Sequence, residues 1–191
     1  DFIRRYLRRY ARDAGRIPLG QMLEFVQARG FDPAGLARAF DAPLGSALHR
    51  LATLPASAGL GPLGLVICDA SGTLLLRKPL DEFPLPRFGA SCALWPLFTA
   101  LTRPAQPVYR MVEQSAREAR RFETFSIAEL TGGMRFGDVA RIEAVMLFRP
   151  SFDAGAEVAG QTPVPVGVSC RICVRTDCSA RREPSVLTEG I

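Results

Sequence analysis

Three cysteines, Cys170, Cys173 and Cys178, lie within nine residues near the end of the chain. Thiolates are soft ligands, and two of them separated by two residues can bind one centre because a turn directs both side chains to the same side. A third thiolate about one turn later can reach the same centre. The C-x2-C-x4-C spacing therefore predicts a metal or iron–sulfur site, with three free surface thiols as the alternative.

A fourth ligand must come from elsewhere, because zinc and iron–sulfur sites prefer four thiolates and no histidine is near. Cys68 and Cys92 remain. Cys68 ends an apolar, strand-like run and is predicted to be a small buried hydrophobic residue. Cys92 follows Ser91, a plausible N-cap of a short apolar helix, and a helix N-terminus stabilises thiolates. Cys92 is therefore the preferred fourth ligand.

The cysteine triplet is surrounded by cationic side chains. Positive charge lowers the pKa of a thiol and offsets the negative charge of a four-thiolate site. The acids nearby are Asp177 and Glu183, whereas four arginines lie close in sequence: Arg171, Arg175, Arg181 and Arg182. These arginines fit a metal site, and they also fit an ordinary solvated surface.

The composition sets the class of protein. The chain has 191 residues, 48% of them hydrophobic, enough for one sizeable core or a small core with a helical appendage. It starts with Asp1 rather than Met, so we expect a fragment of a longer protein. Five cysteines, no signal peptide and no apolar run of roughly 20 residues predict a cytoplasmic protein outside the membrane.

The charge and the reactive residues bear on two classes of function, nucleic-acid binding and catalysis. The net charge of +5 permits contact with nucleic acid or phosphate without establishing it. An enzyme is not expected, because the chain has one histidine, no nucleophile–base pairing and no recognised catalytic motif. That histidine, His49, is predicted to lie on a solvated helix face with no partner nearby.

The first 54 residues show helical periodicity. One face of the first helix carries the apolar side chains Ile3, Tyr6, Leu7, Tyr10 and Ala14. Arg4, Arg8 and Arg12 follow one another at i,i+4 spacing on another face. This basic face is either simply solvated or an electrostatic contact with DNA phosphate or a partner.

Two further helices are predicted between Asp32 and Leu54. Asp32 is expected to be the N-cap of the first, with Pro33 at its first position, and the second follows Pro43. Their spacing resembles a helix-turn-helix. Direct reading of DNA bases and simple packing both remain open for this helix pair.

The small-residue segment 55–62 predicts a domain boundary. We expect a helical segment over residues 1–57, and an α+β sensing domain over residues 58–191. Strands within 63–77, 107–127 and 141–148 would form one antiparallel sheet of GAF or PAS type. The helix from Cys92 would pack against this sheet, and the cysteine-ligated loop would end the domain.

Two segments resemble a known family. Residues 166–184, which contain the cysteine triplet, look like the C-terminal signature of short-chain fatty-acyl-responsive transcriptional regulators. These are bacterial proteins of the Xre helix-turn-helix type, similar to the propionate-metabolism regulators of actinobacteria. Residues 87–95 resemble the same family's glycine-Cys-Pro-Leu-Trp segment, with Ala93 where the family has proline. The resemblance extends from about residue 30 onward.

The resemblance implies a cofactor and partners. The family's sensor domain is regarded as carrying a four-cysteine [4Fe-4S] cluster, and its ligands would be Cys92, Cys170, Cys173 and Cys178. A structural Zn²⁺ site in a protein–protein interaction module is the alternative. DNA would be bound by a domain N-terminal to this fragment. Effector or redox state would shift the geometry of a homodimer.

The resemblance also implies a small-molecule effector, with acyl-CoA as the candidate. An anionic effector needs cationic contacts. The candidates in this sequence are Arg77, Lys78, Arg87 and Arg103.

Overall fold

The computed structural model describes residues 2–115, 119–132, 135–151 and 162–187. The chain divides into two compact units, Asp1–Leu63 and Gly64–Ile191, whereas the sequence placed a boundary between residues 57 and 58. Each unit is described by itself. In the described ranges, no helix is long and apolar enough to cross a membrane.

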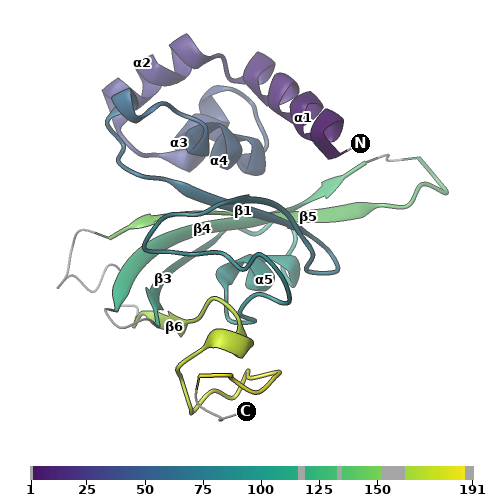
Figure 1. Ribbon diagram of the computed structural model, residues 1–191. Helices are drawn as coiled ribbons and strands as arrows, with labels where there is room; N and C mark the ends of the chain where they lie inside the picture. The colour runs from purple at the N-terminus through teal and green to yellow at the C-terminus, as the bar shows by residue number, and fades with distance from the viewer. Residues whose placement is uncertain (1, 116–118, 133–134, 152–161, 188–191) are drawn as a thin grey trace. The chain divides into compact units, whose positions relative to one another are not determined.

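The first unit gathers four helices around a small apolar core (Figure 1). The helices are α1 (Phe2–Arg16), α2 (Leu19–Arg29), α3 (Pro33–Ala39) and α4 (Leu44–Ala52). The core consists of fully buried side chains, among them Ile17, Met22, Leu36, Leu48 and Leu51. Burial of this apolar surface is the main stabilising contribution to the unit.

The helix ends of this unit follow local sequence signals. The carboxylate of Asp32 accepts a hydrogen bond from the Gly35 N–H at 2.8 Å, and Pro33 stands at the first helical position, so the predicted N-cap is confirmed. Gly30 ends α2 with a φ of 68°, a conformation that favours glycine. Helix α1 continues one residue past Gly15 and ends at Arg16.

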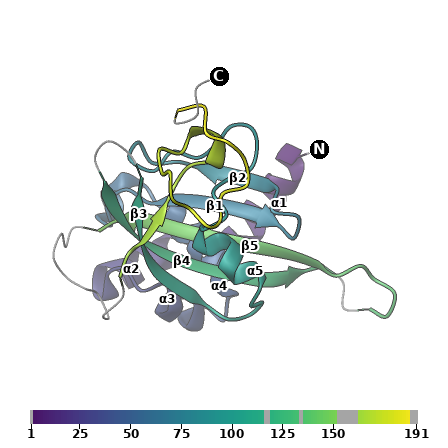
Figure 2. The same cartoon turned by 90° about the horizontal axis from the view of Figure 1, so that it is seen from below.

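The second unit is built on a six-stranded sheet in the order β2-β1-β5-β4-β3-β6 (Figure 2). Its strands are β1 (Gly64–Asp69), β2 (Leu74–Lys78), β3 (Val108–Gln114), β4 (Arg120–Thr131), β5 (Arg141–Pro150) and β6 (Val164–Val166). The first five pair antiparallel, as the sequence predicts.

The purely antiparallel sheet is nevertheless a wrong prediction, because β6 pairs parallel with β3 and makes the sheet mixed. A three-residue strand that contains Pro165 gives almost no sequence signal. Proline cannot donate to a strand ladder, so it is tolerated at an edge position such as this one. Strand β6 has a clear role, since it delivers the chain to the cysteine triplet.

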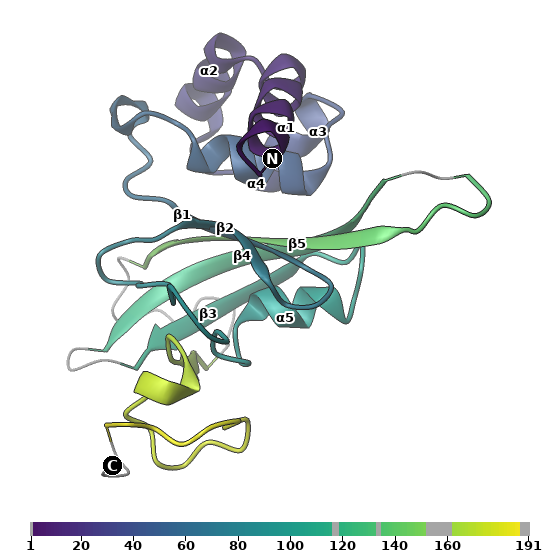
Figure 3. The same ribbon diagram turned by 45° about the vertical axis from the view of Figure 1, so that its right-hand side comes forward.

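Helix α5 (Pro96–Leu101) lies on one face of the sheet, where it contacts β4 and β5 (Figure 3). The core between them contains Phe83, Trp95, Phe122 and Phe148, all fully buried. Phe83 lies at the centre, with ring centroids 4.4 Å from Phe148, 4.9 Å from Phe122 and 5.9 Å from Trp95.

The helix predicted to start at Cys92 with Ser91 as N-cap is a wrong prediction. Helix α5 begins four residues later, at Pro96. Proline suits the first helical position and disfavours helical geometry in the residue before it. Trp95 accordingly has φ −62° and ψ 135°, and Cys92 lies in the turn that leads into the helix.

Candidate cysteine site

Backbone contacts hold the two cysteine segments together. The N–H of Cys92 donates to the carbonyl oxygen of Val168 at 3.0 Å. The indole Nε1 of Trp95 donates to the carbonyl oxygen of Gly167 at 2.9 Å. The segment after β6 is thereby fixed to the turn before α5, although more than 70 residues separate them in the sequence. Figures 1 and 3 show the C-terminal segment, in yellow, on the same side of the sheet as α5.

A small pocket lies where these two segments meet. Its lining includes four cysteines and two arginines, together with small and apolar residues from both segments: Cys92, Cys170, Cys173, Cys178, Arg175 and Arg181. The structure thus brings together the four cysteines that the sequence selects. Cys68 lies instead in β1, fully buried in the core, and burial raises the pKa of its thiol to about 12.

Gly167 lies between two of the thiols. Its N–H donates to Sγ of Cys92 at 3.4 Å, and a Cβ at this position would lie 3.0 Å from Sγ of Cys173. That distance is tighter than nine in ten real Cβ contacts, so Cys173 would have to shift by a few tenths of an ångström to admit a side chain here. The sequence does not predict a role for Gly167 or Trp95. The one sign of their importance is that each lies inside one of the two cysteine motifs.

The Cys92 thiol has a raised pKa. Burial is the largest cause, and the charges of Cys170 and Cys173 add to it, while backbone hydrogen bonds from Gly167 and Leu94 act in the opposite direction. A thiolate at this position needs compensating positive charge.

The loop that carries the triplet is fastened by its own backbone and by two arginines. One turn of 3-10 helix, Cys170–Ile172, begins it, with the Cys173 N–H donating to the Cys170 carbonyl at 3.2 Å. The guanidinium of Arg181 donates to the carbonyl oxygens of Cys170, at 3.4 Å, and of Arg175. Arg175 in turn donates to Pro165 in β6 at 3.0 Å. Both arginines therefore hold the loop and place positive charge beside the thiols.

The donor set suits the group that the sequence implies. All four cysteines are free; Cys92 and Cys173 are buried, and Cys170 and Cys178 are partly exposed. Four thiols beside cationic side chains match the ligand chemistry of both an iron–sulfur cluster and a structural zinc ion. In the part of the chain that the structure describes, no three His, Cys, Asp or Glu side chains form a ready-made group for one metal ion.

The candidate effector contacts fall on different elements. Arg77 and Lys78 end β2, and the Nε of Arg77 donates to the Pro86 carbonyl at 3.1 Å, which brings it beside the loop of Arg87. Partial burial lowers the pKa of Lys78. Arg103 lies on a separate element, just past the C-terminus of α5. The structure thus brings the Arg77 and Arg87 segments together and holds Arg103 elsewhere.

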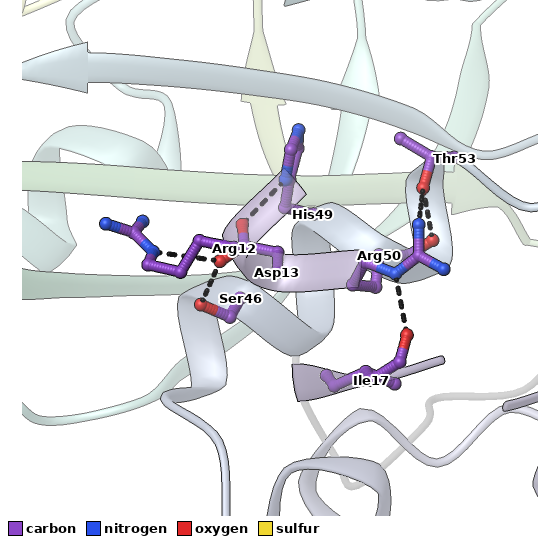
Figure 4. Close-up of polar contacts among 7 residues, drawn as sticks. All are labelled: Arg12, Asp13, Ile17, Ser46, His49, Arg50 and Thr53. Carbon is purple, nitrogen blue, oxygen red and sulfur yellow. Dashed lines mark hydrogen bonds and ion pairs between the residues drawn. The ribbon is translucent and has the colours of Figure 1, made fainter. Parts of the chain in front are cut away.

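The prediction for His49 is wrong. Its side chain is only 2% exposed, and its Nδ1 lies 2.9 Å from Oδ2 of Asp13 (Figure 4). Ser46 donates to the other carboxylate oxygen of Asp13 at 3.0 Å. Among the described residues, Nε2 of His49 has no hydrogen-bond partner. The missed signal was Asp13 itself, an acid three residues after Tyr10 on the apolar face of α1, where it requires a partner.

The Asp13 carboxyl is held in its charged form. Burial alone would raise its pKa, but the hydrogen bonds with His49 and Ser46 outweigh burial and keep the pKa below its ordinary value of 3.8. The rings of Tyr6 and Tyr10 lie edge-on to His49, with centroids at 6.1 and 6.4 Å. This cluster ties α1 to α4 and is a structural feature of the first unit.

Comparison with known proteins identifies relatives along almost the entire chain. The model of the family described as "Short-chain fatty acyl coenzyme A regulator, C-terminal" matches residues 54–189. A protein of Cereibacter sphaeroides named "Propionyl-CoA carboxylase regulator" is 28% identical over an alignment of 186 residues that covers 93% of this chain and 40% of that protein. The "HTH-type transcriptional regulator PrpR" of Mycobacterium tuberculosis is 27% identical over 93% of this chain and 38% of its own length.

The chain therefore spans about 40% of the length of the curated relatives that it matches. A solved structure titled "Mycobacterium tuberculosis transcriptional regulator" superposes with a TM-score of 0.76 at 23% sequence identity. It covers 95% of this chain, and this chain covers 58% of it. At that level of identity, the likeness shows a shared fold.

Proposed function

Since the chain belongs to the C-terminal family of short-chain fatty acyl-coenzyme A regulators, we propose that it is the sensing part of a bacterial transcriptional regulator of short-chain acyl metabolism. Two relatives support this role through their names, one as a regulator of propionyl-CoA carboxylase and one as a helix-turn-helix regulator. The role is regulatory rather than catalytic and belongs to the cytoplasm.

The pocket lined by four cysteines carries the proposal. Its ligands would be Cys92, Cys170, Cys173 and Cys178, holding a [4Fe-4S] cluster. When bound, such a cluster supplies a one-electron redox centre and a cross-link between the two cysteine segments. Gly167 donates a hydrogen bond to Cys92 Sγ, a type of contact that tunes the potential of a thiolate-bound centre.

The contacts of Trp95 suggest how a change at this site reaches the rest of the domain. Trp95 follows Cys92 in the same turn, binds Gly167 through its indole N–H, and packs on Phe83 in the core. A shift of the cysteine loop therefore acts on the aromatic core under the sheet, which we take to be of GAF or PAS type. In a homodimer, such a change would alter the spacing of the DNA-binding domains outside this chain.

An anionic effector, with acyl-CoA as the leading candidate, belongs to the same proposal. The guanidinium of Arg77 is hydrogen-bonded to Pro86, the residue before Arg87, and Lys78 follows Arg77 at the end of β2. Phosphate groups are bound well by such cations. Arg103 would serve as a separate contact.

The test is metal and sulfide analysis of protein purified without oxygen. We expect brown protein with about four iron and four sulfide per chain. Cys92→Ala should lose most of this iron, whereas Cys68→Ala, the matched control in the core, should keep it. Colourless protein with one zinc per chain would refute the cluster and support a structural zinc site instead. Iron that survives Cys92→Ala and disappears in Cys68→Ala would refute the ligand set.

A further inference from the structure

The positive charge of the chain is concentrated in one helix. Helix α1 contains six arginines and one acid, Asp13, which gives it a net charge of +5. The whole chain has the same net charge, so the residues outside α1 balance to zero. A charge excess placed on a single 15-residue helix marks a surface for an anionic partner.

The arginines of α1 are presented to solvent, while its acid is not. Arg4, Arg8, Arg12 and Arg16 are exposed and recur at every fourth residue, so they share one side of the helix. We call these four the arginine face. Asp13 is directed toward Ser46 and His49, and Arg12, which touches it at 3.5 Å, keeps 64% of its side chain exposed (Figure 4).

We propose that the arginine face binds the phosphate backbone of duplex DNA without reading its sequence. Guanidinium groups match phosphate geometry and remain charged at any physiological pH. The face extends about 18 Å along the helix axis, a length over which duplex DNA carries about ten negative charges. This contact is additional to the DNA-binding domain outside the chain and does not depend on the cysteine site.

The apolar side of α1 argues against a membrane surface as the partner. Tyr6 and Tyr10 pack on His49, and the guanidinium carbon of Arg50 lies 5.5 Å from the centre of the Tyr10 ring. Among the side chains of α1 that the structure describes, the exposed large apolar ones are Ile3 at 69%, Leu7 at 55% and Tyr10 at 37%. A helix that lies in a membrane interface buries a broad apolar face, whereas phosphate binding needs only the charge.

The test measures binding of residues 1–191 to a labelled duplex of arbitrary sequence by fluorescence anisotropy, over a series of salt concentrations. The double variant Arg4→Gln/Arg8→Gln should lower the slope of log K against log salt by about 1.8 and weaken binding at least about tenfold at 0.1 M salt. Glutamine keeps helix propensity, and circular dichroism verifies α1. Arg4→Lys/Arg8→Lys should preserve the slope.

The matched control removes the same charge from the same unit. Arg29 and Arg38 are exposed and lie outside α1, so Arg29→Gln/Arg38→Gln should leave the slope near that of the parent. Equal losses in both double variants would mean a general charge effect and would overturn the proposal. No DNA binding by the parent, or binding only to vesicles of anionic lipid, would overturn it as well.

Discussion

The buried pair Asp13–His49 and the cysteine pocket both join elements that are distant in sequence, but they do so differently. In the first unit, ionisable side chains bond directly to one another, and both carboxylate oxygens of Asp13 are used. In the second unit, the backbone and the indole of Trp95 make most of the joining contacts, Cys92 Sγ accepts one hydrogen bond from Gly167, and no disulfide joins the thiols. Polar groups that bond directly to one another stabilise a fold, whereas thiols gathered mainly by other contacts are available for a ligand.

The largest effect that follows from this comparison concerns Asp13. Asp13→Ala should lower the free energy of unfolding of the helical unit by about 3 kcal/mol, because a buried pair loses one member and His49 stays buried. Urea unfolding followed by circular dichroism at 222 nm measures the helices. Fluorescence of Trp95, the single tryptophan of the chain, measures the second unit.

Arg12→Ala is the control for that substitution. Arg12 touches the same carboxylate, but from an exposed position at 3.5 Å, and exposed ion pairs contribute at most about 1 kcal/mol. Similar losses in Asp13→Ala and Arg12→Ala would show that the buried pair has no special role. The Asp13–His49 pair could then no longer be contrasted with the cysteine pocket as the contact that stabilises the fold.

The second effect concerns Gly167. Gly167→Ala should destabilise the second unit by about 2 kcal/mol, because the new methyl group lies 3.0 Å from Sγ of Cys173 and forces that thiol to move. Trp95 fluorescence during urea unfolding is the measurement. Gly20→Ala, in the first turn of α2, is the control for a glycine substitution without a clash, since nothing lies within 4 Å of its added methyl group; circular dichroism at 222 nm measures its effect on the helical unit. An unchanged midpoint in Gly167→Ala would refute the close approach.

Local spacing explains what the sequence could predict. The C-x2-C-x4-C run fixes three thiols in one loop, and the apolar run around Cys68 marks that cysteine as a core residue. The alternation within each strand, the β1–β2 pairing and the cap at Asp32 likewise depend on residues close together in the sequence. These features need no knowledge of how distant segments pack.

The errors arose where distant segments meet. Burial of His49 depends on α1 docking against α4, with its partner 36 residues away. The pairing of β6 with β3 depends on three residues, one of them proline, next to a strand more than 40 residues earlier. Tertiary contacts decide both cases, and hydrophobic periodicity does not report them. The start of α5 is different, because a local signal marks it. Pro96 suits the first helical position, and this preference outweighs the capacity of Ser91 to cap an earlier start.

The smallest effect is the pH dependence of the Asp13 cluster. Because its pKa in the folded chain lies below the ordinary value of 3.8, Asp13 contributes stability that is fully present above that value. The contribution is lost as pH falls through the folded-state pKa, so the helical unit should weaken below about pH 4. The loss should be smaller than in Asp13→Ala, since a protonated carboxyl still accepts from Ser46. Urea unfolding at a series of pH values, followed by circular dichroism at 222 nm, tests this prediction. In Asp13→Asn, the free energy of unfolding should fall less steeply as the pH is lowered below about 4. An equally steep fall in that variant would assign the acid sensitivity to other carboxylates.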